Sequence, residues 1–387
     1  MPIAALILFT LFGHAAIWVG LANRLHASLV PNWFNKLASY VCHGMLVLLP
    51  MAAAAAWLLM RGGVIPSDSR GESSHWPAVC AAYLDLCWLV GGLYGLWWIM
   101  WRLTARVTHR LLPQSTRRVD VSAIVPSPAA TGLVGKLVGL VPGNQVRQIQ
   151  IEEKELVLPA LPRPLDGFSI AHVSDWHLKG RLARSYYEAA VRETNALGCD
   201  LIALTGDLFD RAELLSWIPE TFAKLRAPQG VYFIFGNHDV RHDLTEKARA
   251  ELEAAGLIYL GREARTIAVR GQTILLAGNE QPWLPQAELP PSTADLRILL
   301  AHSPDQFRWA RRRQFDLMLA GHTHGGQVRL PLVGAIYSPS WHGVKYAQGT
   351  FYTAPTVLHV TRGIGCEVPL RLNCPPEIAK LVLRAEC

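Results

Sequence analysis

Three long apolar stretches near the N-terminus constrain this chain more than any other feature of its sequence. Residues 3–22 and 39–60 contain no charged side chain, and residues 77–101 contain only Asp85. At a rise of about 1.5 Å per residue, each stretch is long enough to cross about 30 Å of hydrocarbon as a helix. No lysine or arginine precedes the first stretch, which argues against a cleaved signal peptide. We therefore predict an all-α transmembrane region over residues 1–104, with helices at about these three positions.

Arginines that follow the third stretch set the predicted orientation in the membrane. This cluster contains no acidic residue and consists of Arg102, Arg106, Arg110, Arg117 and Arg118. Because positively charged loops are retained in the cytoplasm, we expect a multi-pass protein of the inner (cytoplasmic) membrane with its remaining residues on the cytoplasmic side. The same arginines could also contact anionic lipid headgroups, or they could serve only to set the topology.

Residues 105–145 have the composition of a basic linker rich in proline and glycine. The stretch "VPSPAATGLVGKLVGLVPGN" is too interrupted to predict a fourth membrane span. Two interpretations stay open for it, a segment that lies on the bilayer surface and a plain linker. The seven cysteines form no CxxC pair, which favours a reducing compartment over a disulfide framework.

From residue 146 to residue 387, short apolar runs alternate with amphipathic stretches. Runs such as "FSIAHVSD", "DLIALTGD", "VYFIFGNHD" and "FDLMLAGHTHGG" have the length of strands and end in Gly, Asp, Asn or His. Stretches such as "RSYYEAAVRETNALG" have the period of helices. Continuous apolar strands separated by helices predict an α/β layered domain with buried strands. Functional sites in such folds lie on loops at the carboxyl ends of the strands.

Asp, His and Asn side chains recur at these strand ends. They are Asp175, His177, Asp207, Asp210, Asn237, His238, His302, His322 and His324. Carboxylate, amide and imidazole donors suit a divalent ion such as Mn, Fe or Zn. Their number exceeds what one tetrahedral ion needs and fits a two-metal site. Taken singly, each residue could instead be a helix cap, a turn residue or a loop histidine.

The ordered set "DWH…GD…GNHD…H…GHTH" resembles the calcineurin-like metallophosphoesterase superfamily. The opening "LDGFSIAHVSDWH" and the closing "TRGIGCEVPLRLNCPPEI" resemble its bacterial membrane-associated branch. The resemblance covers roughly residues 146–386 and does not reach the three apolar stretches. It implies a metallophosphoesterase-like fold, a layered β-sandwich flanked by helices.

Roles for the strand-end residues also follow from the resemblance. It implies a first ion held by Asp175, His177, Asp207 and His324. It implies a second ion held by Asp207, Asn237, His302 and His322, so that Asp207 bridges the pair. His238 would face the substrate phosphate as a proton donor or cation, and Asp210 would orient His238 and raise its pKa.

These expectations define a metal-dependent phosphoric ester or pyrophosphate hydrolase anchored in a membrane. A hydroxide shared by two divalent ions would attack a phosphodiester or pyrophosphate bond. The anchor and the arginine cluster favour a lipid-linked or nucleotide-linked lipid substrate and membrane lipids as partners, and we expect no nucleic acid. The resembling branch includes enzymes that cleave the pyrophosphate of a UDP-linked diacyl sugar.

Two other functions stay open on the sequence alone. One is a general phosphodiesterase or phosphatase with a soluble substrate, for which the helices are only a tether. The other is a non-catalytic membrane sensor or scaffold, although none of the expected ligands is missing.

Overall fold

The computed structural model describes residues 3–28, 30–61, 76–104, 111–121, 137–286, 288–289 and 293–386. The chain forms two compact units, Met1–Arg106 and Val107–Cys387.

Three long helices build the N-terminal unit, and they confirm the three predicted apolar helices. They are α1 (Ile3–His26), α2 (Asn32–Arg61) and α3 (Trp76–Thr104). All three are long and apolar enough to cross a membrane by length and composition. Their apolar side chains are largely exposed, as a lipid environment requires.

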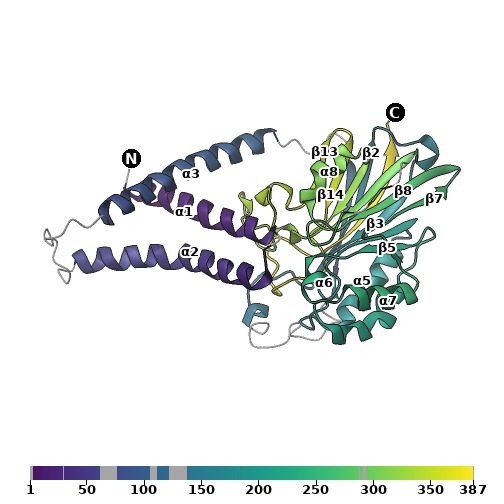
Figure 1. Cartoon of the computed structure of the whole chain (residues 1–387), viewed down its shortest axis with the longest axis horizontal. Helices are drawn as coiled ribbons and strands as arrows, with labels where there is room; N and C mark the ends of the chain where they lie inside the picture. The colour runs from purple at the N-terminus through teal and green to yellow at the C-terminus, as the bar shows by residue number, and fades with distance from the viewer. Residues whose placement is uncertain are drawn as a thin grey trace. The chain divides into compact units, whose positions relative to one another are not determined.

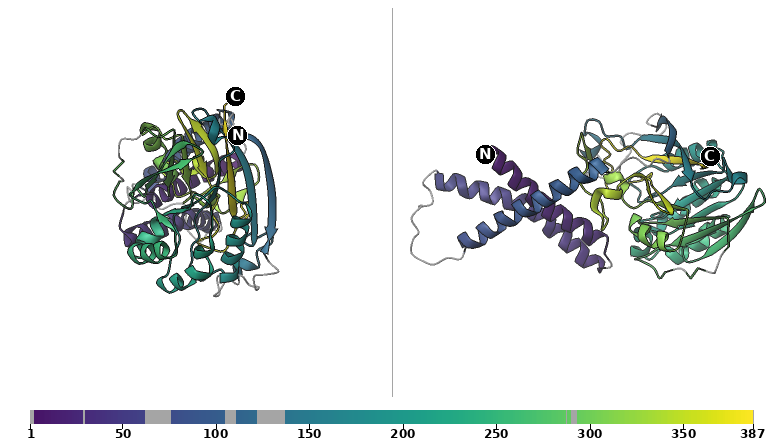
Figure 2. Two further views of the ribbon diagram at one scale, coloured as in Figure 1. Left: turned by 90° about the vertical axis from the view of Figure 1, so that its right-hand side faces the viewer. Right: turned by 90° about the horizontal axis from the view of Figure 1, so that it is seen from above.

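Small residues and a few polar contacts hold these helices together. Gly13 on α1 approaches α3 so closely that an added Cβ would lie 1.8 Å from the carbonyl oxygen of Cys87. His14 Nδ1 lies 2.6 Å from the Tyr83 hydroxyl, and Trp18 donates to the same hydroxyl over 2.9 Å. Figure 2 shows α1 and α3 crossing. Close approach at small residues with interhelical hydrogen bonds is typical of packing between membrane helices.

The stretch predicted as a linker differs from the prediction, because it contains a strand. Strand β1 (Leu111–Asp120) pairs antiparallel with β2 (Gln148–Leu158) and belongs to the second unit. Residues 114–118 are exposed, so this edge strand carries no apolar pattern by which the sequence could reveal it. Residues 105–110 and 122–136 lie outside the described residues, and so do the side chains of Arg102, Arg106 and Arg110.

Two mixed sheets form the second unit. The seven-stranded sheet has the order β1-β2-β15-β3-β4-β5-β6. Its remaining strands are β15 (Glu377–Ala385), β3 (Ser169–Val173), β4 (Leu201–Thr205), β5 (Val231–Ile234) and β6 (Ile258–Tyr259). The parallel run β3-β4-β5-β6 matches the predicted alternation of buried strands and helices.

The six-stranded sheet has the order β13-β14-β10-β9-β8-β7. Its strands are β7 (Ala264–Val269), β8 (Gln272–Asn279), β9 (Leu296–Ala301), β10 (Leu317–Ala320), β13 (Gly349–Thr353) and β14 (Thr356–Val360). A separate small hairpin joins β11 (Arg329–Leu330) to β12 (Gly334–Ala335).

The core has three layers of apolar side chains, which confirms a layered β-sandwich flanked by helices. Leu201 and Ala203 of β4 face the second sheet, whereas Ile202 and Leu204 of the same strand face the helices. Helices α5 (Arg184–Ala196) and α7 (Thr245–Ala254) cover the outer face of the first sheet. Helix α8 (Phe307–Arg312) covers the outer face of the second sheet, and Figure 1 shows it beside β13 and β14.

Candidate metal centre

The predicted site residues lie close together on the loops that follow five strands, which are β3, β4, β5, β9 and β10. Each of the loops that follow these strands carries one or two of them. Three clusters in the described residues have donor atoms that all lie within 4.8 Å of one another; one combines His177 with Asp210, His238 and Glu367, and the remaining two consist of predicted metal ligands alone. The first of these two is formed by Asp175, His177 and His324, and the second by Asp207, His302 and His322.

In the first cluster, two imidazole rings lie close to one carboxylate. His177 Nε2 lies 3.1 Å from His324 Nε2, and His324 Nε2 lies 3.5 Å from Asp175 Oδ1. The main-chain N–H of His322 donates to the same aspartate over 3.0 Å. All four residues are buried, so these donors face one another rather than water.

The second cluster adds an amide oxygen. His302 Nε2 lies 3.2 Å from His322 Nδ1 and 3.2 Å from Asn237 Oδ1. The other nitrogen of His302 lies 2.7 Å from the carbonyl oxygen of Thr205, which fixes the ring. Asn237 begins the short helix α6 (Asn237–Arg241) directly after the loop at the end of β5.

Asp207 lies between the two clusters. Its Oδ2 is 3.5 Å from His177 Nε2 in the first cluster and 3.2 Å from His302 Nε2 in the second. Its Oδ1 accepts the main-chain N–H of His238 over 2.8 Å, which orients the carboxylate. Burial alone would raise the pKa of Asp207, but the neighbouring His302 and His238 hold it well below its usual value. A permanently charged carboxylate at this position can serve both clusters at once.

The donor set fits two divalent cations. Each cluster offers imidazole nitrogens and a carboxylate oxygen, which are the donors that Mn, Fe and Zn accept. Burial by itself would lower the pKa of His302, but the negative charge of Asp207 outweighs burial and raises this pKa to about 9. The centre therefore stabilises positive charge. Burial also lowers the pKa values of His322 and His324 well below the ordinary value, which keeps both rings neutral and able to ligate.

Backbone strain is concentrated at the same residues. Asp175, His177, Asp207, His322 and His324 all have φ between 46° and 69°. Residues other than glycine rarely adopt this left-handed region, and they persist there only where the surrounding structure holds them. Such outliers gather at functional sites.

Glycine is required where two of these loops meet. A Cβ added at Gly236 would lie 2.2 Å from Asp207 Oδ1, and one at Gly321 would lie 2.4 Å from Asp175 Oδ2. Any side chain at either position would displace a candidate ligand.

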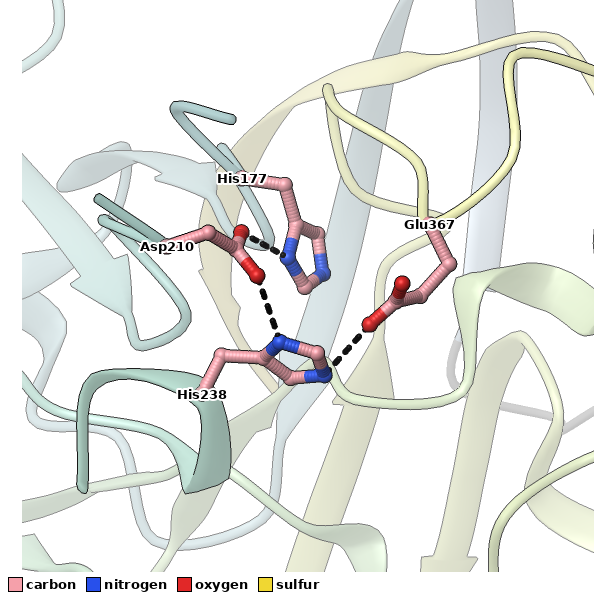
Figure 3. A group of neighbouring side chains, drawn as sticks. All are labelled: His177, Asp210, His238 and Glu367. Carbon is pink, nitrogen blue, oxygen red and sulfur yellow. Dashed lines mark hydrogen bonds and ion pairs between the residues drawn. The ribbon is translucent and has the colours of Figure 1, made fainter. Parts of the chain in front are cut away.

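His238 lies beside the clusters with a carboxylate on each ring nitrogen (Figure 3). Asp210 Oδ1 is 2.7 Å from its Nδ1, as predicted, and Glu367 Oε1 is 2.6 Å from its Nε2. Asp210 also reaches His177 Nδ1 over 2.9 Å with its other oxygen, so one carboxylate orients both rings. Burial opposes a charged imidazole, but Asp207, Asp210 and Glu367 raise the pKa of His238 well above its usual value.

Glu367 and its partner Lys179 were not predicted from the sequence. Lys179 Nζ lies 2.6 Å from Glu367 Oε2 and 3.4 Å from Asp210 Oδ1. Glu367 belongs to the closing segment "TRGIGCEVPLRLNCPPEI", which marked the resemblance but showed nothing of where its carboxylate lies.

Arg371 fixes the closing segment to the centre and was also missed. Its buried guanidinium donates to the carbonyl oxygens of His324 over 3.1 Å and of Arg362 over 2.9 Å, and it also contacts Gly365. An arginine in a loop is ordinarily exposed, so its sequence context gave no sign of this role.

Trp283 packs against the second cluster. Its ring centroid lies 5.5 Å from that of His302 and 5.0 Å from that of His322. Its indole N–H is buried with no hydrogen-bond partner in the described part of the chain. The tryptophan therefore borders the second cluster of candidate ligands.

The profile of the family described as Calcineurin-like phosphoesterase matches residues 168–326. This interval contains all nine residues predicted for the site, from Asp175 to His324. Glu367 and Arg371 lie beyond it.

Individual relatives match a longer part of the chain. Phosphodiesterase YaeI of Escherichia coli (strain K12) is 37% identical over 227 residues, which are 56% of this chain and 82% of the relative. Uncharacterized metallophosphoesterase YkuE of Bacillus subtilis (strain 168) is 30% identical over 247 residues, 61% of this chain and 86% of the relative. A transmembrane protein with metallophosphoesterase domain from Danio rerio is 27% identical over 261 residues, 62% of this chain and 59% of the relative.

Proposed function

Because this chain belongs to the calcineurin-like phosphoesterase family and is a metal-dependent phosphoester hydrolase, we propose that it cleaves a phosphodiester or pyrophosphate bond at the centre around Asp207. The position of Asp207 between the two donor clusters is the observation that supports this proposal most directly. A single carboxylate shared by two histidine clusters is the arrangement that two neighbouring cations need.

We assign one ion to Asp175, His177, Asp207 and His324, and the other to Asp207, Asn237, His302 and His322. The distances within each set support this division. Mn, Fe and Zn all suit the mixture of nitrogen and oxygen donors. Two such ions would supply an activated water near neutral pH and offset charge on the phosphoryl oxygens.

The chain's own residues would supply the proton for the leaving group. His238 carries a proton on Nε2, the nitrogen that faces Glu367, and donates it to the departing oxygen. Asp210 holds the opposite nitrogen and keeps the ring charged and aligned. Glu367 accepts the same Nε2 proton, so an incoming phosphoester competes with this carboxylate for His238.

We propose a lipid-linked or nucleotide-linked lipid substrate and a location in the inner membrane with the catalytic unit in the cytoplasm. The three apolar helices and the arginine cluster that follows them support this proposal. A soluble phosphoester with the helices as a tether is the second candidate, and it is supported by the partial exposure of the centre at Glu367, whose side chain is 39% exposed.

Replacing Asp207 tests the proposed chemistry. We expect the full chain with Asp207→Ala to lose both ions and to hydrolyse a chromogenic phosphodiester with Mn²⁺ at least about a hundredfold more slowly. Asp295→Ala is the matched control, because Asp295 is an exposed aspartate whose carboxylate accepts hydrogen bonds from Thr273. Wild-type turnover by Asp207→Ala would contradict the mechanism. A wild-type protein with less than one ion per chain and no activity with Mn²⁺ would favour a sensor or scaffold.

A further inference from the structure

The catalytic unit carries a strongly exposed apolar hairpin close to the metal centre. Leu330, the last residue of β11, and the turn residues Pro331, Leu332 and Val333 that lead to β12 are consecutive, and we call these four residues the hairpin tip. The side chains of Leu330, Leu332 and Val333 are 45%, 90% and 46% exposed. Ile336 extends the same apolar surface just beyond β12. A contiguous run of this kind is not ordinary surface for a soluble domain.

The backbone at Leu332 is strained. Its φ is 64°, in the left-handed region that glycine or asparagine adopts more readily than leucine. A bulky apolar residue that is both strained and exposed destabilises the free domain. Such an outlier points to a functional constraint on the side chain itself.

The hairpin is attached rigidly to the loop that carries His324. A Cβ added at Gly326 would lie 2.6 Å from Ala335 Cβ, so the base of the hairpin packs directly on this loop. Val328 forms a parallel bridge with Leu372, and Asn373 Nδ2 donates to the Arg329 carbonyl over 3.0 Å. A surface that binds the hairpin tip therefore also keeps the candidate metal centre at a fixed distance from that surface.

A second exposed apolar side chain belongs to a segment that is hydrogen-bonded to the loop that carries His302. Trp341 is 53% exposed, and its main-chain N–H donates to Asp305 Oδ2 over 3.1 Å. Asp305 also accepts the hydroxyl of Ser340 over 2.6 Å and follows His302 by three residues. An indole held at the surface is typical of groups that lie at a membrane interface.

The charge of this region suits an anionic surface. No aspartate or glutamate occurs between Asp316 and Glu367, whereas Arg329 and Lys345 lie on either side of the tip and Trp341. Basic residues around an apolar insertion are attracted to anionic phospholipids.

We propose that the hairpin tip and Trp341 dock into the headgroup region of a phospholipid bilayer and hold the metal centre at the membrane surface. The bilayer is the occupant because the same chain has three helices that can span it, and because the segment 317–366, which carries the tip and Trp341, exposes apolar and aromatic side chains and contains no acidic residue. This inference is independent of which phosphoester is the substrate. It adds a second membrane contact, made by the catalytic unit itself.

Photo-cross-linking of the full chain in lipid nanodiscs tests the docking. Leu332 is replaced by p-benzoylphenylalanine, and the protein is embedded in nanodiscs of phosphatidylcholine with about a third phosphatidylglycerol. Lys247, an exposed residue of α7, receives the same replacement as the control. After irradiation, mass spectrometry of peptides identifies what has been linked to each position.

We expect the yield of lipid adduct to be about tenfold higher at position 332 than at position 247, and to fall in pure phosphatidylcholine. Equal yields at the two positions would overturn the proposal. So would adducts at position 332 that join a second copy of the chain or one of the chain's own apolar helices. Both labelled proteins should hydrolyse a soluble chromogenic phosphodiester at the wild-type rate, which shows that each is folded.

Discussion

At the scale of single residues, the candidate metal centre places several histidines around two shared carboxylates. Asp207 reaches His177 and His302 with one oxygen, and Asp210 reaches His177 and His238 with two. Each of these histidines is therefore oriented by a carboxylate that also contacts a second histidine. Substitutions here are therefore expected to affect neighbouring groups as well as the residue replaced.

The two histidines of "GHTH" are predicted to serve different ions. His322 Nδ1 faces His302, whereas His324 Nε2 faces His177 and Asp175. We expect His322→Ala and His324→Ala each to lower the metal content from about two ions per chain to about one. The measurement is metal analysis of the purified full chains, and loss of both ions in equal measure from both variants would contradict the division.

Glu367 is predicted to compete with substrate for His238. Its carboxylate lies 2.6 Å from His238 Nε2, where a negatively charged phosphoester must approach. We expect Glu367→Gln to lower KM for an anionic phosphodiester roughly threefold to tenfold, because a repelling charge is removed. Steady-state kinetics measures this, and Glu246→Gln on the exposed side of α7 is the control. A fall in kcat with unchanged KM would assign Glu367 to proton transfer instead.

At the scale of elements, a buried ionic network joins the two sheets. Lys154 of β2 lies 2.6 Å from Glu152 and 2.8 Å from Glu377 of β15, and it also contacts His359 of β14 in the second sheet. The chain of contacts continues from His359 Nδ1 to His172 of β3 over 2.9 Å. His172 in turn reaches the hydroxyl of Thr205, the last residue of β4 before the loop with Asp207. The network therefore fixes the end of the strand that carries the bridging carboxylate.

Lys154→Met tests how much this network stabilises the fold. The lysine is buried, so its loss leaves Glu152 and Glu377 to share the charge of Arg362 and should cost about 3–5 kcal/mol of the free energy of unfolding. Lys380→Met is the matched control on β15, because Lys380 pairs with the half-exposed Glu153 and should cost less than about 1 kcal/mol. Thermal unfolding measures both, and equal effects would contradict the assignment.

At the scale of the whole molecule, the chain combines a helical unit with a catalytic unit whose first strand is β1. We expect a chain that begins at Val107 to be monodisperse and to hydrolyse a soluble chromogenic phosphodiester. A chain that begins at Val121 lacks β1, so the outer edge of β2 is left unpaired and should associate with other chains. Size-exclusion chromatography compares the two, and equal behaviour would show that β1 is dispensable.

The sequence by itself determined the elements whose apolar pattern is strong. Three uncharged stretches predicted α1, α2 and α3, because only a helix of that length and composition suits a bilayer. Apolar strands that end in Asp, Asn or His predicted the layered α/β fold and the convergence of the site residues. Both predictions depend on local patterns that tertiary contacts reinforce.

Only the tertiary structure decided what depends on contacts between distant segments. Glu367 and Arg371 reach the centre because the closing segment folds back onto the loops of His177 and His324, and no local pattern encodes that path. Strand β1 is recognised by its hydrogen bonds to β2, since an exposed edge strand has no apolar period. The hairpin tip likewise looks like a core strand in sequence, and its exposure follows from packing alone, because burial is a property of the fold and not of the residue.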